Sequence, residues 1–183
     1  GLCCRRLFAW GLSVTLCAAG QTWTPVMDVS FGEQGGGQWI FDASPSENHA
    51  VLGTGERAER RDPVWALTPK GGGALTFDGH DDLVTVPHTL SLVPVAGLRV
   101  EVWFKQTRRS EYARLVDKGA GFDVYIHEQG FASFRFHGAE ASGVRTDRPI
   151  PLDQWCHLKG EYDGKMLSIW LNGECVGTRP FAG

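Results

Sequence analysis

The sequence predicts an all-β fold, an antiparallel two-sheet sandwich, and three observations carry that prediction. Apolar and polar residues alternate with a period of two in several short windows, and turn dipeptides recur between them. No window shows a sustained helical period with caps. The chain of 183 residues is 42% hydrophobic, which is enough for one good core. We expect about a dozen strands, a number that favours a sandwich over a small closed barrel.

The first clear strand lies at residues 98–105, where Leu98 to Phe104 alternate apolar and polar side chains. Residues 122–137 predict a hairpin with its turn at Gln129–Gly130. Residues 73–86 predict two shorter strands around Asp78–Gly79, a dipeptide that is typical of two-residue hairpin turns.

The stretch from Trp155 to Thr178 predicts a three-stranded meander with strands at 155–162, 166–171 and 174–178. Asp163–Gly164 and Asn172–Gly173 supply its two turns. Cys156 and His157 are neighbours on the first of these strands, so their side chains point to opposite faces and cannot form a catalytic dyad. Cys175 lies two strands away, too far for a disulfide with Cys156. We therefore expect free thiols or bonds to partners outside this chain.

The first twenty residues have the parts of a secretory signal peptide. Arg5 and Arg6 precede an uncharged apolar stretch over 7–19, and the small residues Ala18, Ala19 and Gly20 stand at its end. About thirteen apolar residues are too few to cross a bilayer, which needs roughly 20. The expected domains are a signal peptide at 1–20 and one mature domain at 21–183, secreted or in the cell envelope. The alternative is an apolar first strand or a short buried helix.

The charge balance points away from two classes of partner. The formal net charge is −3, so the chain has no basic footprint for nucleic acid or for an anionic membrane surface. After signal removal we expect no membrane insertion.

Four segments, taken in order, resemble the laminin-G-like jelly-roll domains of the concanavalin A-like lectin and glucanase superfamily. They are WIFDASPSENHAVLG, GGGALTFDGHDDLVTVP, LRVEVWFK and QWCHLKGEYDGKMLSIWLNGECVG. The resemblance covers about residues 27–178 and implies a jelly-roll sandwich. Such domains usually close with further strands, so the domain is expected to be incomplete at its C-terminal end, within a larger extracellular protein.

The resemblance also implies a structural Ca²⁺ ion near the opening segment. Asp42 and Asn48 are the positions that could match its ligands, since hard oxygen donors suit calcium. The alternative is that Asp42 caps a loop in an Asx turn.

An enzyme of the same superfamily would need paired carboxylates. Glu161 and Asp163 begin the E-x-D-x-E pattern of sandwich-fold glucanases, but Lys165 stands where the third acid would be. We therefore expect no enzymatic activity in this chain.

A ligand surface is expected where polar and aromatic residues lie opposite the apolar residues of their strands. If those strands are neighbours, they form an aromatic and basic platform suited to carbohydrate. The candidate residues are Trp103, Tyr125, His127, Arg135, His137, His157 and Trp170. The alternative is that loops cover this face and make it a second, minor core.

These observations favour a secreted, non-catalytic module that binds carbohydrate or a protein partner. An accessory domain of a secreted glycoside hydrolase, or a glucanase itself, is the alternative.

Overall fold

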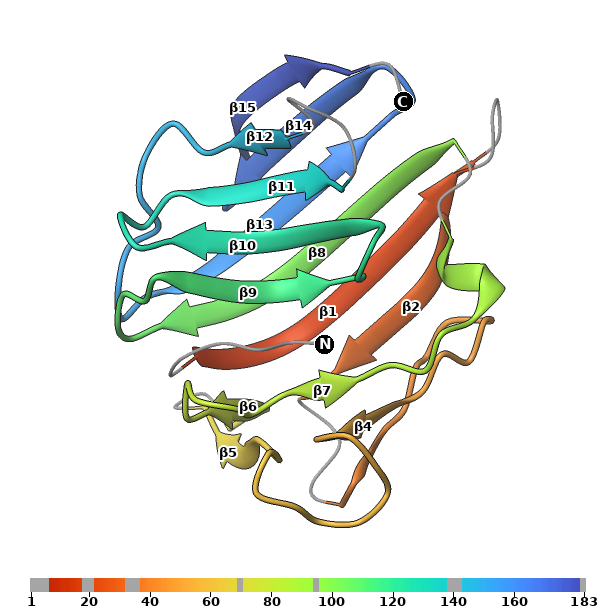
Figure 1. Cartoon of the computed structure of the whole chain (residues 1–183), viewed down its shortest axis with the longest axis vertical. Helices are drawn as coiled ribbons and strands as arrows, with labels where there is room; N and C mark the ends of the chain where they lie inside the picture. The colour runs from red at the N-terminus through yellow and green to blue at the C-terminus, as the bar shows by residue number, and fades with distance from the viewer. Residues whose placement is uncertain are drawn as a thin grey trace.

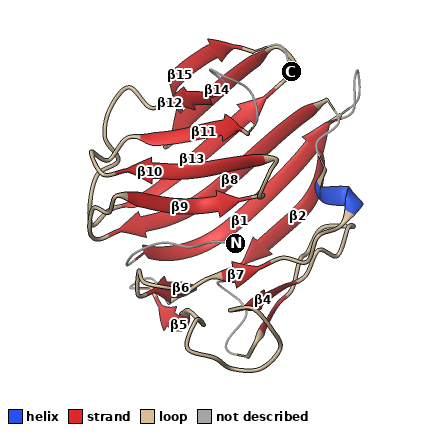
Figure 2. Cartoon of the chain, in the orientation of Figure 1, coloured by secondary structure: helices blue, strands red, loops and turns tan. Residues whose placement is uncertain are grey.

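The computed structural model describes residues 7–17, 22–31, 37–68, 71–93, 96–137 and 143–181. Antiparallel strands form one large sheet, and two smaller sheets lie across it in a second layer (Figure 1). Within these ranges the one helical segment is the 3₁₀ turn η1 (Leu90–Leu92), visible beside an otherwise all-strand chain in Figure 2. The predicted all-β sandwich is therefore confirmed. No helix among the described residues is long and apolar enough to cross a membrane.

The large sheet has eight strands in the order β15-β14-β13-β8-β1-β6-β5, with β2 paired to β1 beside β6. Its strands are β1 (Leu7–Cys17), β2 (Thr24–Ser30), β5 (Val64–Leu67), β6 (Gly73–Phe77), β8 (Gly97–Gln106), β13 (Trp155–Tyr162), β14 (Met166–Leu171) and β15 (Glu174–Pro180).

The second layer consists of a four-stranded and a three-stranded sheet. The four-stranded sheet runs β12-β11-β10-β9, with β9 (Tyr112–Asp117), β10 (Phe122–His127), β11 (Ala132–Phe136) and β12 (Gly143–Arg145). The three-stranded sheet contains β3 (Trp39–Ile40), β4 (Ala50–Leu52) and β7 (Val84–Thr85).

The core lies between the two layers because each strand turns its apolar residues inward. In β8 buried and half-buried residues alternate from Leu98 to Gln106, as a period of two requires. The contact is tight where β11 crosses β13: a Cβ added to Gly160 would lie 2.6 Å from Cγ of Phe134. Glycine at this position lets the Phe134 ring sit directly on the opposite sheet.

The strand predictions agree with the structure except at Asp78–Gly79. The hairpin β10–β11 and the meander β13–β14–β15 form as predicted. In contrast, β6 pairs with β1 and β5, while β7 pairs with β4 in another sheet. The predicted hairpin at Asp78–Gly79 is therefore wrong. The Asp78 carboxylate accepts from His80 N and the Asp82 carboxylate accepts from Asp78 N, so the segment forms a corner between layers.

The apolar segment of the expected signal peptide occupies the middle of the large sheet. β1 lies antiparallel between β8 on one side and β2 and β6 on the other. Leu12 and Val14 are only 4% and 5% exposed in the core. This is the alternative that the sequence left open, an apolar first strand, and the folded unit of this structure includes it. Residues 1–6 and 18–20 lie outside the described residues.

Candidate functional site

The seven predicted platform residues fall into two groups on opposite outer surfaces of the sandwich. Tyr125, His127, Arg135 and His137 belong to the four-stranded sheet at β10 and β11 or directly after it, whereas Trp103, His157 and Trp170 lie on β8, β13 and β14 of the large sheet. In both groups the intervening residues are buried in the core or, like Phe136, packed against it, so the side chains face outward. The assumption that these strands are neighbours in one sheet is therefore wrong.

The first group, with Tyr112 added, forms what we term the tyrosine face: Tyr112, Tyr125, His127, Arg135 and His137. The rings of Tyr112 and Tyr125 stack at 5.2 Å between centroids, and the His127 ring lies 4.9 Å from Tyr125 and 5.4 Å from Tyr112. Tyr125 is 6% exposed but Tyr112 is 51% exposed. In this cluster the Tyr125 ring is buried underneath, and the Tyr112 ring on top of it is open to solvent.

A buried ion pair fixes Arg135 beside these rings. Its Nε and Nη2 donate to the two carboxylate oxygens of Asp123, each at 2.8 Å, and Asp123 is 1% exposed. The hydrogen bonds to Asp123 raise the pKa of Arg135. The guanidinium carbon lies 4.5 Å from the Tyr125 ring centroid, within cation–π range, and His137 Nε2 lies 3.5 Å from Asp123 Oδ2. A bidentate pair of this kind holds a side chain in one orientation.

The second group forms what we term the tryptophan face: Trp103, His157 and Trp170. The Trp103 and His157 rings stack at 4.2 Å, and His157 Nε2 lies 2.8 Å from Glu101 Oε2. Lys159 Nζ lies 4.1 Å from the Trp170 ring centroid. Both tryptophan rings carry an imidazole or an ammonium on one face, as Tyr112 carries Tyr125. Trp103 and Trp170 are only half-exposed, however, whereas Tyr112 is exposed and so offers more ring surface to a ligand.

Three carboxylates on β8, β13 and the turn after β13 are each engaged by protein donors. Glu161 accepts from Arg99 Nε at 2.8 Å, and the hydrogen bond from His157 lowers the pKa of Glu101. Asp163 accepts from the backbone amides of Met166 and Lys165, and these bonds lower its pKa. It therefore caps the turn between β13 and β14.

The thiols take the positions that the strand pattern predicts. Cys156 is 2% exposed on the inner face of β13, opposite to His157, and burial raises the pKa of its thiol. Cys156 and Cys175 are both free, and Cys175 is exposed on β15. A buried thiol with a raised pKa is a poor nucleophile.

The Asp42 and Asn48 side chains form a buried hydrogen-bond hub. The Asp42 carboxylate accepts from Asp28 N, Ser44 N, Ser44 Oγ and Asn48 N at 2.7–2.8 Å. Asn48 Oδ1 accepts from Thr89 Oγ1 at 2.6 Å, and its Nδ2 donates to Val26 O. The bond from Ser44 N is the Asx turn that the sequence offered as the alternative to calcium. As placed, these oxygens accept from protein donors, and a calcium ion, which takes six or more oxygen ligands, would need further ligands besides them.

A separate acidic group lies at the corner between β6 and β7. One carboxylate oxygen from each of Asp78, Asp81 and Asp82 lies within 4.8 Å of the others, the one such group among the described residues. Burial raises the pKa of Asp82, while Asp81 Oδ2 accepts from Arg60 at 2.8 Å. The acid-rich run around His80 is its signal in the sequence.

Sequence reasoning missed Tyr112, the most exposed ring of the tyrosine face. It opens β9, a strand whose pattern is broken by a register shift opposite Val124 and Tyr125. The signal was the short run YARLVD, which begins with an aromatic residue and continues with apolar residues at every second position.

Comparison with known proteins gave one match. A family model described as the concanavalin A-like lectin/glucanases superfamily matches residues 78–183, more than half of the chain. The matched region contains β7 through β15 and so includes the whole tyrosine face. No curated protein and no solved structure matches the chain.

Proposed function

The chain belongs to the concanavalin A-like lectin and glucanase superfamily, and from this premise we propose that it is a non-catalytic module that binds carbohydrate on the tyrosine face. The observation that carries the proposal is the half-exposed Tyr112 ring, stacked on Tyr125 and placed beside an Arg135 that Asp123 holds in position. A sugar ring stacks its apolar face on such an aromatic side chain. The described contacts of the Arg135 guanidinium use Nε and Nη2, which leaves Nη1 for a hydroxyl or acidic group.

The non-catalytic part of the proposal rests on the state of the carboxylates. Glycosidases need one ionised carboxylate and one carboxylic acid free to act on the substrate. Glu101 is paired with His157, and Glu161 is paired with Arg99 and Lys159. Hydrolysis of a β-glucan by the purified chain that Glu101→Gln abolishes would overturn this part and favour the glucanase alternative.

The proposal includes export from the cell, on the basic, apolar and small-residue pattern of residues 1–20. Cleavage of a signal peptide after residue 20 would remove β1 from the large sheet. One molecule therefore cannot both be exported with cleavage and retain β1. N-terminal sequencing of the protein recovered from the culture medium distinguishes them. A protein that is found only inside the producing cells would contradict export.

The test of ligand binding is a glycan array probed with the chain and with single variants on the two faces. We expect Tyr112→Ala to lower the affinity for any retained glycan about tenfold, a loss of about 1.4 kcal/mol. Trp155→Ala is the matched control, because Trp155 is an exposed ring (38%) on the large sheet. If Trp155→Ala or Trp103→Ala removed binding and Tyr112→Ala did not, the tyrosine face would not be the site.

A further inference from the structure

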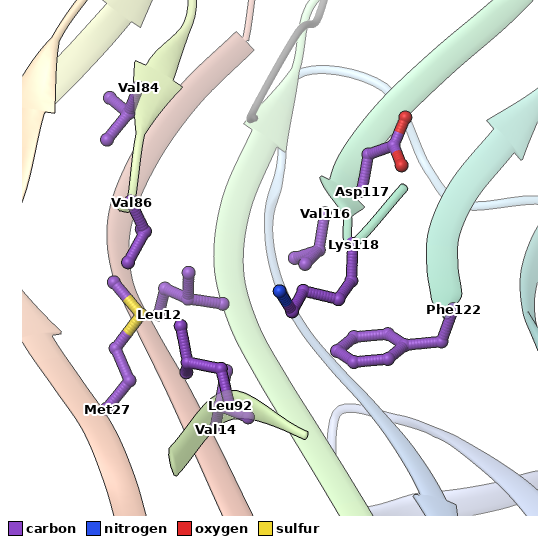
Figure 3. Close-up of a pocket in the computed structure, with 10 residues that line it drawn as sticks. All are labelled: Leu12, Val14, Met27, Val84, Val86, Leu92, Val116, Asp117, Lys118 and Phe122. Carbon is purple, nitrogen blue, oxygen red and sulfur yellow. The ribbon is translucent and has the colours of Figure 1, made fainter. Parts of the chain in front are cut away.

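A slot between the two layers opens where the four-stranded sheet ends and the three-stranded sheet begins. Its volume is about 80 Å³. Figure 3 shows Leu12 and Val14 of β1 with Met27 of β2 on one side, and Val116 and Phe122 on the other. The remaining apolar lining residues are Val84, Val86 and Leu92. The slot is therefore lined by hydrocarbon side chains from both layers of the sandwich.

A cation extends over this apolar slot. Figure 3 shows the Lys118 side chain reaching from the end of β9 toward Leu12, with its ammonium above the lining. Lys118 Nζ lies 2.7 Å from His88 Nδ1. Among the described residues it forms no ion pair with a carboxylate. An imidazole partner does not neutralise the ammonium as a carboxylate would.

The one acidic residue in the lining does not neutralise Lys118. Asp117 accepts from Arg114 Nη1 at 2.8 Å and from Gly119 N at 2.8 Å, so each of its oxygens has a donor. Its carboxylate is also directed away from the slot (Figure 3). An anion above the slot therefore meets the Lys118 charge with little opposition from Asp117.

We propose that this slot binds short aliphatic carboxylates, with the hydrocarbon tail between Met27 and Phe122 and the carboxylate on Lys118. The apolar lining favours hydrocarbon, and the ammonium complements a carboxylate in charge. Because a cavity of about 150 Å³ holds benzene, the slot has room for about three to four carbon atoms. Butyrate and pentanoate match this room, because their hydrocarbon tails beyond the carboxylate have about three to four carbon atoms.

The slot is independent of the proposed carbohydrate site. It lies between the layers, whereas the tyrosine face is the outer surface of the four-stranded sheet. It requires β1, so it belongs to the chain that retains residues 7–17. Loss of glycan binding in Tyr112→Ala therefore says nothing about the slot. Loss of butyrate binding in Lys118→Met likewise says nothing about the tyrosine face.

The two methionines of the chain provide an internal comparison. Met27 lines the slot, whereas Met166 lies on the outer surface of the large sheet, where it alternates with buried Leu167. We would label the methionine methyl groups of the full chain with ¹³C and titrate acetate, propionate, butyrate and pentanoate. The Met27 resonance should shift and the Met166 resonance should not. Affinity should rise about fourfold for each added methylene until the slot is full.

Two lysine variants test the cation. Lys118→Met should weaken butyrate binding about two- to fivefold, the range for a partly exposed ion pair, and should leave binding of 1-butanol unchanged. Lys165→Met, in the exposed turn between β13 and β14, is the matched control and should behave as the unaltered chain. A Met27 resonance that butyrate leaves unmoved would overturn the proposal. So would equal shifts at Met27 and Met166, or equal butyrate affinity in Lys118→Met and the unaltered chain.

Discussion

Deletion of residues 1–20 tests the structure most directly, because it removes β1 from the middle of the large sheet. β8 would lose its pairing with β1 along residues 97–106 and keep only β13, and β6 would keep only β5. β2 would lose the strand to which it is paired. The gap would separate the meander and β8 from β2, β5 and β6. A two-layer sandwich that is split in this way cannot keep its present core closed.

The free energy at stake is of the order of the whole stability of a domain. Leu12 and Val14 are 4% and 5% exposed, and full burial of such side chains contributes about 1.5–3 kcal/mol each. Every backbone hydrogen bond lost from the β1 ladders adds about 0.5–1.5 kcal/mol. Domains of this size are stable by only about 5–15 kcal/mol in total. We therefore expect the chain 21–183 to lose the cooperative unfolding transition of the full chain.

The assay is urea unfolding of the two chains, followed by tryptophan fluorescence and by far-ultraviolet circular dichroism. Leu12→Ala in the full chain gives a smaller perturbation, with an expected loss of about 2–5 kcal/mol. Ser13→Ala is its control, because Ser13 lies between the two buried residues and faces outward, where substitutions cost less than about 0.5 kcal/mol. The reasoning is refuted if 21–183 unfolds at the same urea midpoint and with the same m value as 1–183, since m follows the surface that unfolding exposes.

Three further predictions concern single side chains. Asp42→Asn should cost about 2–6 kcal/mol in urea unfolding, because two buried donors lose their acceptor; an unchanged urea midpoint would contradict this. EDTA should not change the Tm of the unaltered chain, and a calcium-dependent Tm that Asp42→Asn abolishes would show instead that Asp42 holds an ion. Glu101→Gln should cost at most about 1 kcal/mol at pH 7. The hydrogen bond from His157 lowers the pKa of Glu101 in the folded protein. The contribution of Glu101 to stability is therefore present above its unfolded pKa of about 4.3 and is lost as the pH falls through the folded pKa. A stability difference between Glu101→Gln and the unaltered chain that grows below pH 4 would have the wrong sign. Gly160→Ala should cost about 1–3 kcal/mol by overpacking against Phe134, and an unchanged urea midpoint would show that the two layers are less tightly packed there.

The strands that the sequence predicted correctly are those in which the alternation of apolar residues and a turn dipeptide occur together. In the meander, alternation fixes which residues are buried, and Asp163–Gly164 and Asn172–Gly173 fix the register of neighbouring strands. The structure has Asn172 and Gly173 both at positive φ, the conformation that favours this dipeptide in a tight turn. Local information of this kind is sufficient for a hairpin and for a meander.

Pairing between distant segments was not predictable in the same way. Asp78–Gly79 has the same turn chemistry, but β7 finds its partner in β4, about thirty residues upstream. The same limit explains the candidate site. Alternation places Tyr125 and Trp103 on outward faces correctly, but it does not say to which sheet a strand belongs, and the two residues lie on opposite sides of the sandwich.

The ambiguity of residues 7–17 has a physical origin. A signal peptide needs a short uncharged apolar segment, and a strand buried in the centre of a sheet needs an uncharged segment of about the same length. β1 also fits its place in the sheet. Its outward positions carry the small residues Gly11, Ser13 and Thr15, and these lie beside the larger Trp103 and Glu101 of β8. A signal peptide has no reason to alternate small and large residues with the period of a strand. The alternation of Leu12 and Val14 with these residues is therefore the sequence feature that argues for β1 as a structural strand, and Leu12→Ala against Ser13→Ala measures whether the alternation matters.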